Sequence, residues 1–243
     1  MKIVVFAGPT LRAEDREALP AATFSGPAAC GDVARAAREP FDAIAIIDGY
    51  FHQRLSVWHK EILWALAHGL RVYGAASMGA LRAAELSDFG MVGVGRVFEW
   101  FRDGVLEDDD EVAIVHDSAE RGYAARSDAM VNVRATLERA EAAGVVSSGT
   151  VARLVALAKS MFFAERSFAA LLAAAEAGAI GGDERPALAA WLRDPANPID
   201  QKRLDAMALL RRIREDLVEP RAPEPPGFIF QYTEAWHELM RRL

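Results

Sequence analysis

Two short, nearly continuous apolar runs, residues 2–7 and 41–47, constrain the fold of this chain more than any other feature. Turn-forming residues follow each run, a pattern typical of strands that are buried on both faces of a sheet. Residues 71–76 form a third β-prone run, and helix-forming segments separate the three. Strands that alternate with helices build a parallel sheet with right-handed crossovers. The sequence therefore predicts an α/β fold, in which a Rossmann-like parallel sheet carries helices on both faces and a mainly helical C-terminal region follows.

Further elements are expected along the chain from hydrophobic periodicity and from capping and turn residues. The additional strands are expected at 21–24 and 112–115. The helices are expected at 12–18, 31–38, 56–68, 78–87, 129–142, 149–158, 165–177, 184–193 and 200–217. We therefore expect three parts: an α/β core at 1–126, a helical region at 127–219, and a proline-rich linker with a detached aromatic tail at 220–243.

Composition excludes several classes of protein. The 243 residues are 52% hydrophobic, which is enough for a substantial core, and the net charge of 28 − 35 = −7 argues against nucleic-acid binding. A single cysteine, Cys30, excludes an internal disulfide and a multi-cysteine zinc site. No segment approaches the roughly 18 apolar residues of a membrane span, and the run at 2–7 is too short for the core of a signal peptide. We expect a cytoplasmic protein with no membrane or nucleic-acid partner.

The segment 71–82 is the most informative part of the chain for function. A β-prone run ends in small residues, presents Ser77, and continues as a helix-forming sequence. A hydroxyl at such a turn lies at the carboxyl end of a parallel sheet and at a helix N-terminus, where N–H groups favour negative charge. The loop Gly8-Pro9-Thr10 and the pair Asp48-Gly49 follow the two other strands, so all three segments are expected at one edge.

Ser77, His59 and Asp48 are the first candidate catalytic set. Acyl transfer needs a nucleophile, a base and a group that orients the base, and these three side chains can supply those roles. The N–H of Met78, with one from Gly49 or from the Gly8 loop, could stabilise an oxyanion. The strict G-x-S-x-G pattern is not met, because position 75 is Ala. The ordinary alternative makes Ser77 a helix cap, His59 a surface residue and Asp48 a turn former.

Other polar residues leave alternatives open. Lys60 could replace His59 as the base, and His52 and His116 are further candidates. Arg82 could clamp a carboxylate or pair with Glu85 on its helix. The acidic run at 103–111 does not have the spacing of a calcium-binding loop, so we interpret it as a solvated loop and expect no metal site.

Seven segments together resemble the TfuA-like protein family, in the same order and over roughly residues 1–135. They are Gly8-Pro9-Thr10-Leu11, Gly26-Pro27-Ala28 with Gly31-Asp32, Ile47-Asp48-Gly49-Tyr50-Phe51, His59-Lys60-Glu61-Ile62-Leu63, Gly74 to Leu86, Gly90-Met91-Val92-Gly93-Val94-Gly95 and Asp109-Asp110-Glu111-Val112-Ala113. The helical remainder is only loosely similar.

The resemblance implies a role in peptide thioamidation. TfuA-like proteins accompany YcaO enzymes, which use ATP to activate a peptide amide oxygen, and the products are backbone thioamides of ribosomally made peptides or of methyl-coenzyme M reductase. Such a protein is expected to hydrolyse a thiocarboxylated ubiquitin-like sulfur-carrier protein and release sulfide. Ser77 would attack the terminal carbonyl, His59 or Lys60 would take the proton, and Lys60 or Arg82 would bind the negative charge.

The expected partners are a YcaO protein, the sulfur-carrier protein and, through YcaO, the peptide. No cofactor is expected on this chain, because ATP belongs to YcaO. The alternative function is a non-catalytic adaptor or allosteric partner that docks on YcaO through its helical half or its aromatic tail. A small-anion or nucleotide-binding protein with a Rossmann-like sheet is less well supported, because the glycines at 90–95 do not follow a clear strand.

Overall fold

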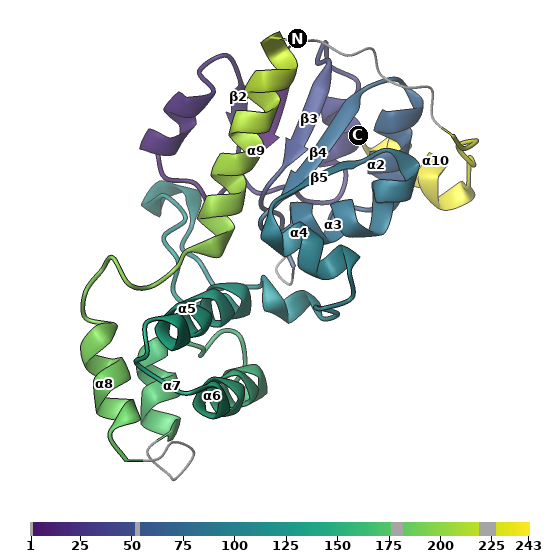
Figure 1. Ribbon diagram of the computed structural model, residues 1–243. Helices are drawn as coiled ribbons and strands as arrows, with labels where there is room; N and C mark the ends of the chain where they lie inside the picture. The colour runs from purple at the N-terminus through teal and green to yellow at the C-terminus, as the bar shows by residue number, and fades with distance from the viewer. Residues whose placement is uncertain (1, 52–53, 176–181, 219–226) are drawn as a thin grey trace. The chain divides into compact units, whose positions relative to one another are not determined.

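The computed structural model describes residues 2–51, 54–175, 182–218 and 227–243 (Figure 1). The chain divides into two compact units, one formed by residues 1–107 together with 202–243 and the other by 108–201. The helical region is therefore an insertion in the sequence of the sheet-containing unit. None of the helices in the described ranges is long and apolar enough to cross a membrane.

A five-stranded, all-parallel sheet forms the centre of the first unit, in the order β2-β1-β3-β4-β5. The strands are β1 (Ile3–Phe6), β2 (Thr23–Ser25), β3 (Ala43–Ile46), β4 (Arg71–Ala75) and β5 (Val92–Val94). Phe6 pairs with Ile46, which pairs with Gly74, so the carboxyl ends of the three central strands lie at the same edge. The α/β class and the parallel sheet predicted from the sequence are confirmed.

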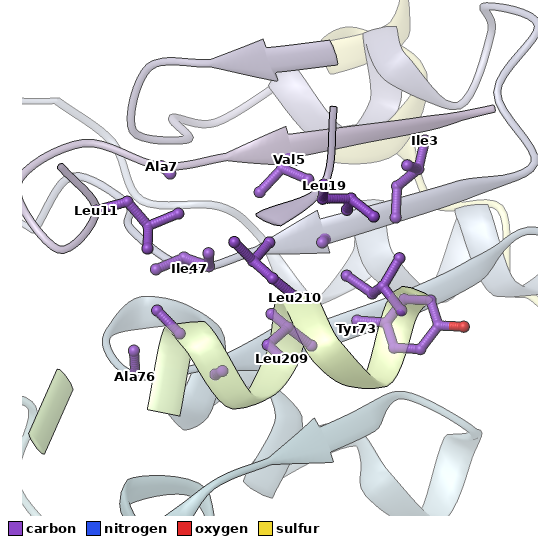
Figure 2. Packing of buried hydrophobic residues seen from close by; sticks show 14 of the residues in the cluster. Ile3, Val5, Ala7, Leu11, Leu19, Ile47, Tyr73, Ala76, Leu209 and Leu210 are labelled. Carbon is purple, nitrogen blue, oxygen red and sulfur yellow. The ribbon is translucent and has the colours of Figure 1, made fainter. Parts of the chain in front are cut away.

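Helices cover both faces of this sheet. The helices of the first unit are α1 (Asp32–Ala36), α2 (His59–Ala67), α3 (Met78–Leu86), α4 (Arg96–Arg102), α9 (Gln201–Val218) and α10 (Glu234–Arg242), with short 3-10 turns η1 (Glu14–Ala18) and η2 (Ser87–Phe89). Alternate strand residues such as Val5 and Tyr73 pack against Leu209 and Leu210 of α9, as Figure 2 shows. The intervening strand residues are also buried, and α2 and α3 contact β4.

Helix α9 belongs with the sheet, not with the helical region at 127–219 in which the sequence placed it. The reason is its apolar face: Ala206, Leu209, Leu210 and Ile213 are fully buried in the cluster that includes the strands. Figure 1 shows α9 lying along the strands of the first unit.

The C-terminal segment is not a detached tail. Trp236 and Leu239 of α10 pack against Trp64 of α2 and Ala34 of α1, and the Trp64 and Trp236 ring centroids lie 5.5 Å apart. The expected proline-rich linker at 220–226 lies outside the described residues. Burial of the two tryptophans explains why α10 adheres to the sheet-containing unit.

The expected strand at 112–115 is wrong, because the fifth strand is Val92–Val94 instead. Sequence patterning missed β5 because it is only three residues long and has Gly93 at its centre. A Cβ at Gly93 would lie 2.2 Å from the Phe98 ring, so the glycine allows α4 to pack closely on β5. Gly95 likewise faces the Asp205 side chain. These glycines serve packing in the folded unit.

The second unit, 108–201, is helical. It contains α5 (Met130–Ala142), α6 (Ser148–Ser160), α7 (Phe168–Ala174), α8 (Glu184–Trp191), η3 (Asp109–Glu111) and η4 (Ala119–Arg121). The acidic run is only in part the solvated loop that we expected. Asp103, Glu107, Asp108 and Asp109 are exposed, whereas Asp110 pairs with Lys159 and with the fully buried Arg166, and Glu111 pairs with Arg134. The last two carboxylates therefore neutralise cations of the same unit.

Helix α3 approaches the sheet more closely than any side chain would permit. A Cβ at Gly79 would lie 1.7 Å from the Ile46 carbonyl oxygen, and one at Gly74 would lie 2.1 Å from the Gly79 oxygen. Both obstacles are backbone atoms, so no side-chain rotation relieves them.

We therefore expect Gly79→Ala to lower the free energy of unfolding by roughly 3 kcal/mol or more, because backbone must move to make room. Chemical denaturation measures the change. Gly149→Ala is the control: a Cβ at Gly149 would meet no neighbouring group within 4 Å, and the residue lies in the first turn of α6, so its replacement should be neutral or stabilising. Equal stability of Gly79→Ala and the wild type would contradict the close approach.

The packing of α9 on η1 should be sensitive to acid. Arg203 donates two hydrogen bonds to the buried Asp15 carboxylate, at 2.8 and 2.6 Å, and these bonds are the main cause that lowers the pKa of Asp15. A lowered carboxyl pKa contributes stability above the unfolded value of about 4, and that stability disappears as the pH falls through the folded pKa. Urea unfolding from pH 5 down to 2 should therefore show a steeper loss of stability for the wild type than for Arg203→Met. Parallel curves for the two proteins would show that the pair does not titrate as described.

Candidate functional site

Ser77 occupies a tight, strained turn between β4 and α3. Ala76 has a φ of +67°, in the left-handed region that residues with a Cβ rarely adopt. The Ser77 N–H donates to the Ala75 carbonyl at 2.8 Å, and Ser77 itself has φ −126° and ψ −125°. Its side chain is 3% exposed and forms no capping hydrogen bond to α3. Ser77 is therefore the N-cap residue of α3 by position, as the ordinary interpretation had it, but its side chain does not cap the helix.

Two of the expected oxyanion donors have backbone N–H groups that make no hydrogen bond within the described part of the chain. In the first turn of α3, the Gly79 N–H bonds to the Ile47 oxygen and the Ala80 N–H to the Ser77 oxygen, whereas the Met78 N–H has no acceptor among the described residues. The Gly49 N–H also lacks an acceptor in that part of the chain. A Cβ at Gly49 would lie 2.7 Å from Met78 Cγ, so the two residues are in contact.

Asp48 holds the Gly8-Pro9-Thr10 loop and not the imidazole of His59. Its carboxylate is 2% exposed and accepts hydrogen bonds from the Gly8 N–H at 2.8 Å, the Thr10 N–H at 3.1 Å and the Thr10 hydroxyl at 2.6 Å. Because the Gly8 N–H is used in this way and Pro9 has none, the loop offers neither of these groups to an oxyanion. The expected orienting role of Asp48 is therefore wrong.

The structure pairs His59 with Glu85 and separates it from Ser77. His59 Nε2 lies 2.7 Å from Glu85 Oε2, and the imidazole is about half exposed. Glu85 follows Ser77 by eight residues, which is about 12 Å along a helix axis. His59 is therefore a surface partner of Glu85, as the alternative interpretation had it.

Arg82 belongs to the same surface group. Its Nε donates to the Val57 carbonyl at 3.0 Å and its Nη1 to Glu85 Oε2 at 2.7 Å. Although burial opposes the effect, hydrogen bonds and charges from His59 and Arg82 lower the pKa of Glu85. The alternative of an Arg82–Glu85 pair is thus confirmed, and the guanidinium is not placed as a substrate clamp.

The other candidate bases lie elsewhere. Lys60 Nζ sits 5.2 Å from the centre of the Phe230 ring, a cation–π contact with the C-terminal segment. The His116 ring contacts the Asp117 carbonyl in the unit 108–201, and His52 lies outside the described residues. Burial and the neighbouring Glu61 raise the pKa of the Cys30 thiol to about 11, which leaves it protonated near neutral pH.

Lys202 is the charged residue of this edge that sequence reasoning missed. It is 3% exposed, lies in the first turn of α9, and places Nζ 3.9 Å from Asp48 Oδ1. A signal was present: Lys202 begins the series 202, 206, 209, 210 and 213, which has the spacing of one helix face. A lysine at the head of an apolar stripe is buried together with that stripe.

Asp205 follows Lys202 by three residues in α9 and binds the start of α4. Its carboxylate accepts a hydrogen bond from the Val97 N–H at 2.7 Å and lies against Gly95, which has a φ of +97°. The N-terminal part of α9 thus contributes the cation Lys202 and the anion Asp205 to the carboxyl edge. The two charges hold the loops that follow β1, β3 and β5.

Comparison with known proteins identifies a family. No curated protein matches the chain. The model of the TfuA-like protein family matches residues 48–167, a range that includes Asp48, Gly49, Ser77 and Met78. With the segments that resemble this family, the match supports assignment of the chain to the TfuA-like protein family.

Proposed function

We propose that this protein supplies sulfide to a YcaO enzyme that forms backbone thioamides in peptides, by hydrolysing a thiocarboxylated ubiquitin-like sulfur-carrier protein. The observation that carries the proposal is the strained turn that presents Ser77. Its hydroxyl is not used to cap α3, and the adjacent Met78 N–H has no acceptor in the described ranges. A serine beside unused N–H groups supplies two parts of an acyl-transfer site, the nucleophile and the oxyanion donors.

The reaction proceeds in two steps on this chain. Ser77 Oγ attacks the terminal carbonyl of the carrier, a C–O bond forms, and the Met78 and Gly49 N–H groups hold the oxyanion. The C–S bond then breaks, the serine proton leaves with the sulfur as HS⁻, and an ester on Ser77 remains. Water hydrolyses this ester to a carboxylic acid and regenerates the hydroxyl.

This scheme needs no cofactor on the chain. ATP serves the YcaO partner, which activates the peptide amide oxygen, and the released sulfide replaces that oxygen. The peptide accordingly contacts YcaO and not Ser77. Because the sulfur leaves as HS⁻ with the serine proton, the acylation step does not require the His59 or Lys60 base that the sequence suggested.

Ser77→Ala should reduce sulfide release from a thiocarboxylated carrier by at least about 1,000-fold, because it removes the nucleophile. A sulfide-sensitive dye or electrode measures the rate. Ser87→Ala is the matched control, since Ser87 lies at the other end of α3 and its hydroxyl donates to the Ala84 carbonyl. Full activity in Ser77→Ala would eliminate Ser77 as the nucleophile.

Free sulfide added to the YcaO reaction distinguishes sulfide supply from docking on YcaO. If the protein only supplies sulfide, free sulfide should restore thioamide formation by YcaO in the presence of Ser77→Ala. Mass spectrometry of the peptide reads the result. Restoration without any added TfuA-like protein would also show that docking is dispensable.

The second candidate function is a non-catalytic adaptor, which exposed side chains of the C-terminal segment favour. Ile229 is 83% and Tyr232 61% exposed, although Trp236 nearby is buried. Apolar side chains presented in this way are typical of contact surfaces.

Replacement of Ile229 by Asp tests the adaptor directly. If this surface docks on YcaO, Ile229→Asp should weaken stimulation of YcaO by roughly tenfold or more and leave sulfide release unchanged. Peptide thioamidation and sulfide release are measured on the same preparations. Unchanged stimulation would remove this surface from consideration, and the buried Trp236 makes point substitution preferable to deletion of the segment.

A further inference from the structure

We propose that Lys202 makes the Ser77 site specific for an acyl donor that carries negative charge at the reacting carbonyl, so that a thiocarboxylate is accepted because it is an anion. The inference rests on the proposed function, since it concerns the substrate of the same serine. It assigns to α9 a role in binding that lies outside the range matched by the family model.

The position of Lys202 follows from contacts around Asp48. Lys202 Nζ lies 3.9 Å from the Asp48 carboxylate, and the residues on both sides of Asp48 touch the start of α3. On one side the Ile47 oxygen accepts the Gly79 N–H, and on the other Gly49 contacts Met78. The ammonium group therefore belongs to the edge at which β4 ends and Ser77 follows.

Helix α9 approaches the Ser77 turn from a second direction. Ala76 is fully buried in the same cluster as Ala206, which lies one turn beyond Lys202, and Figure 2 shows Ala76 beside α9. Side chains in the first turn of a helix point toward its N-terminus. Lys202 therefore extends past the cluster toward the edge, where the loops after β1 and β3 meet.

Lys202 is paired with a carboxylate: its Nζ lies 3.9 Å from Asp48 Oδ1, and lysine is seldom buried without such a partner. Its role at the Ser77 site is that of a cation that attracts an anion, and not of a base that takes the Ser77 proton. In a site from which water is largely excluded, its attraction for an anion is stronger than at the surface.

Negative charge is what makes a thiocarboxylate hard to attack. Its charge is shared between oxygen and sulfur, which lowers the electrophilicity of the carbon and repels an approaching oxygen nucleophile. An ammonium beside the thiocarboxylate offsets that charge before the C–O bond forms. A neutral thioester needs no such compensation, so the two substrates separate the role of Lys202 from that of Ser77.

The decisive comparison uses a carrier protein with a C-terminal thiocarboxylate and the same carrier with a C-terminal S-methyl thioester. Lys202→Met should slow sulfide release from the thiocarboxylate by roughly 10- to 100-fold, the effect of one charge-assisted contact, and change methanethiol release from the thioester by less than about threefold. Lys202→Arg, which keeps the charge, should retain more thiocarboxylate activity than Lys202→Met. Lys2→Met is the control, because Lys2 is exposed at the opposite, amino-terminal end of β1.

A binding measurement covers the case in which Lys202→Met does not fold. In Ser77→Ala, which keeps Lys202, a carrier ending in a carboxylate should bind at least about tenfold more tightly than the same carrier ending in an amide. Calorimetry measures both affinities without turnover. The preference should weaken as salt concentration rises.

The outcomes distinguish this inference from the proposed function. Equal losses on both substrates in a folded Lys202→Met, no loss on either, or equal binding of carboxylate and amide by Ser77→Ala would overturn the role of Lys202. Absence of turnover by the wild type on both substrates would refute hydrolysis at Ser77. The carboxylate preference of Ser77→Ala would in that case still decide whether the edge binds an anion.

Discussion

The buried carboxylate of Asp48 is the interaction on which the carboxyl edge depends. A charge that is 2% exposed must be compensated inside the protein, because its transfer from water is costly. Three donors from Gly8 and Thr10 and the ammonium of Lys202 provide that compensation. The loop after β1, the end of β3 and the start of α9 are thereby joined. Removal of either charge would bury the other without this ion pair, so Asp48 and Lys202 depend on each other.

Close backbone packing determines where the hydroxyl of Ser77 lies. Gly74 and Gly79 let α3 rest directly against β3 and β4, so the helix begins almost as soon as β4 ends. Only Ala76 and Ser77 are available to reverse the chain direction, and Ala76 adopts a positive φ in consequence. The strain at this turn is thus a result of helix–sheet packing, and stable packing of α3 maintains it. The serine is presented by the same contacts that hold the sheet together.

The sequence predicted the parts of this protein that are set by local patterns. Continuous apolar runs identified β1, β3 and β4, and small residues around Ser77 identified the turn. It did not identify β5, because three residues with a central glycine give no periodic signal. Nor could it pair His59 with Glu85, since that contact depends on the relative rotation of two helices. Lys202 was missed because its importance comes from Asp48, which lies more than 150 residues away in the sequence and adjacent in space.

The candidate site therefore combines residues from two distant parts of the sequence. Asp48 and Ser77 are close in the chain and lie within the segment that matches the family model, whereas α9 returns to the sheet only after the helical unit 108–201. Helix α9 is held there by the apolar face from Ala206 to Ile213, which is independent of the chemistry at its first turn. Burial of that face orders Lys202 before any ligand arrives, and a cation that is already ordered loses little entropy when an anion binds. A site of this kind needs no histidine beside the serine, provided that the leaving group carries its own charge and accepts the proton. The packing of α9, which orders Lys202, would then allow this edge to bind and cleave a thiocarboxylate without a separate base.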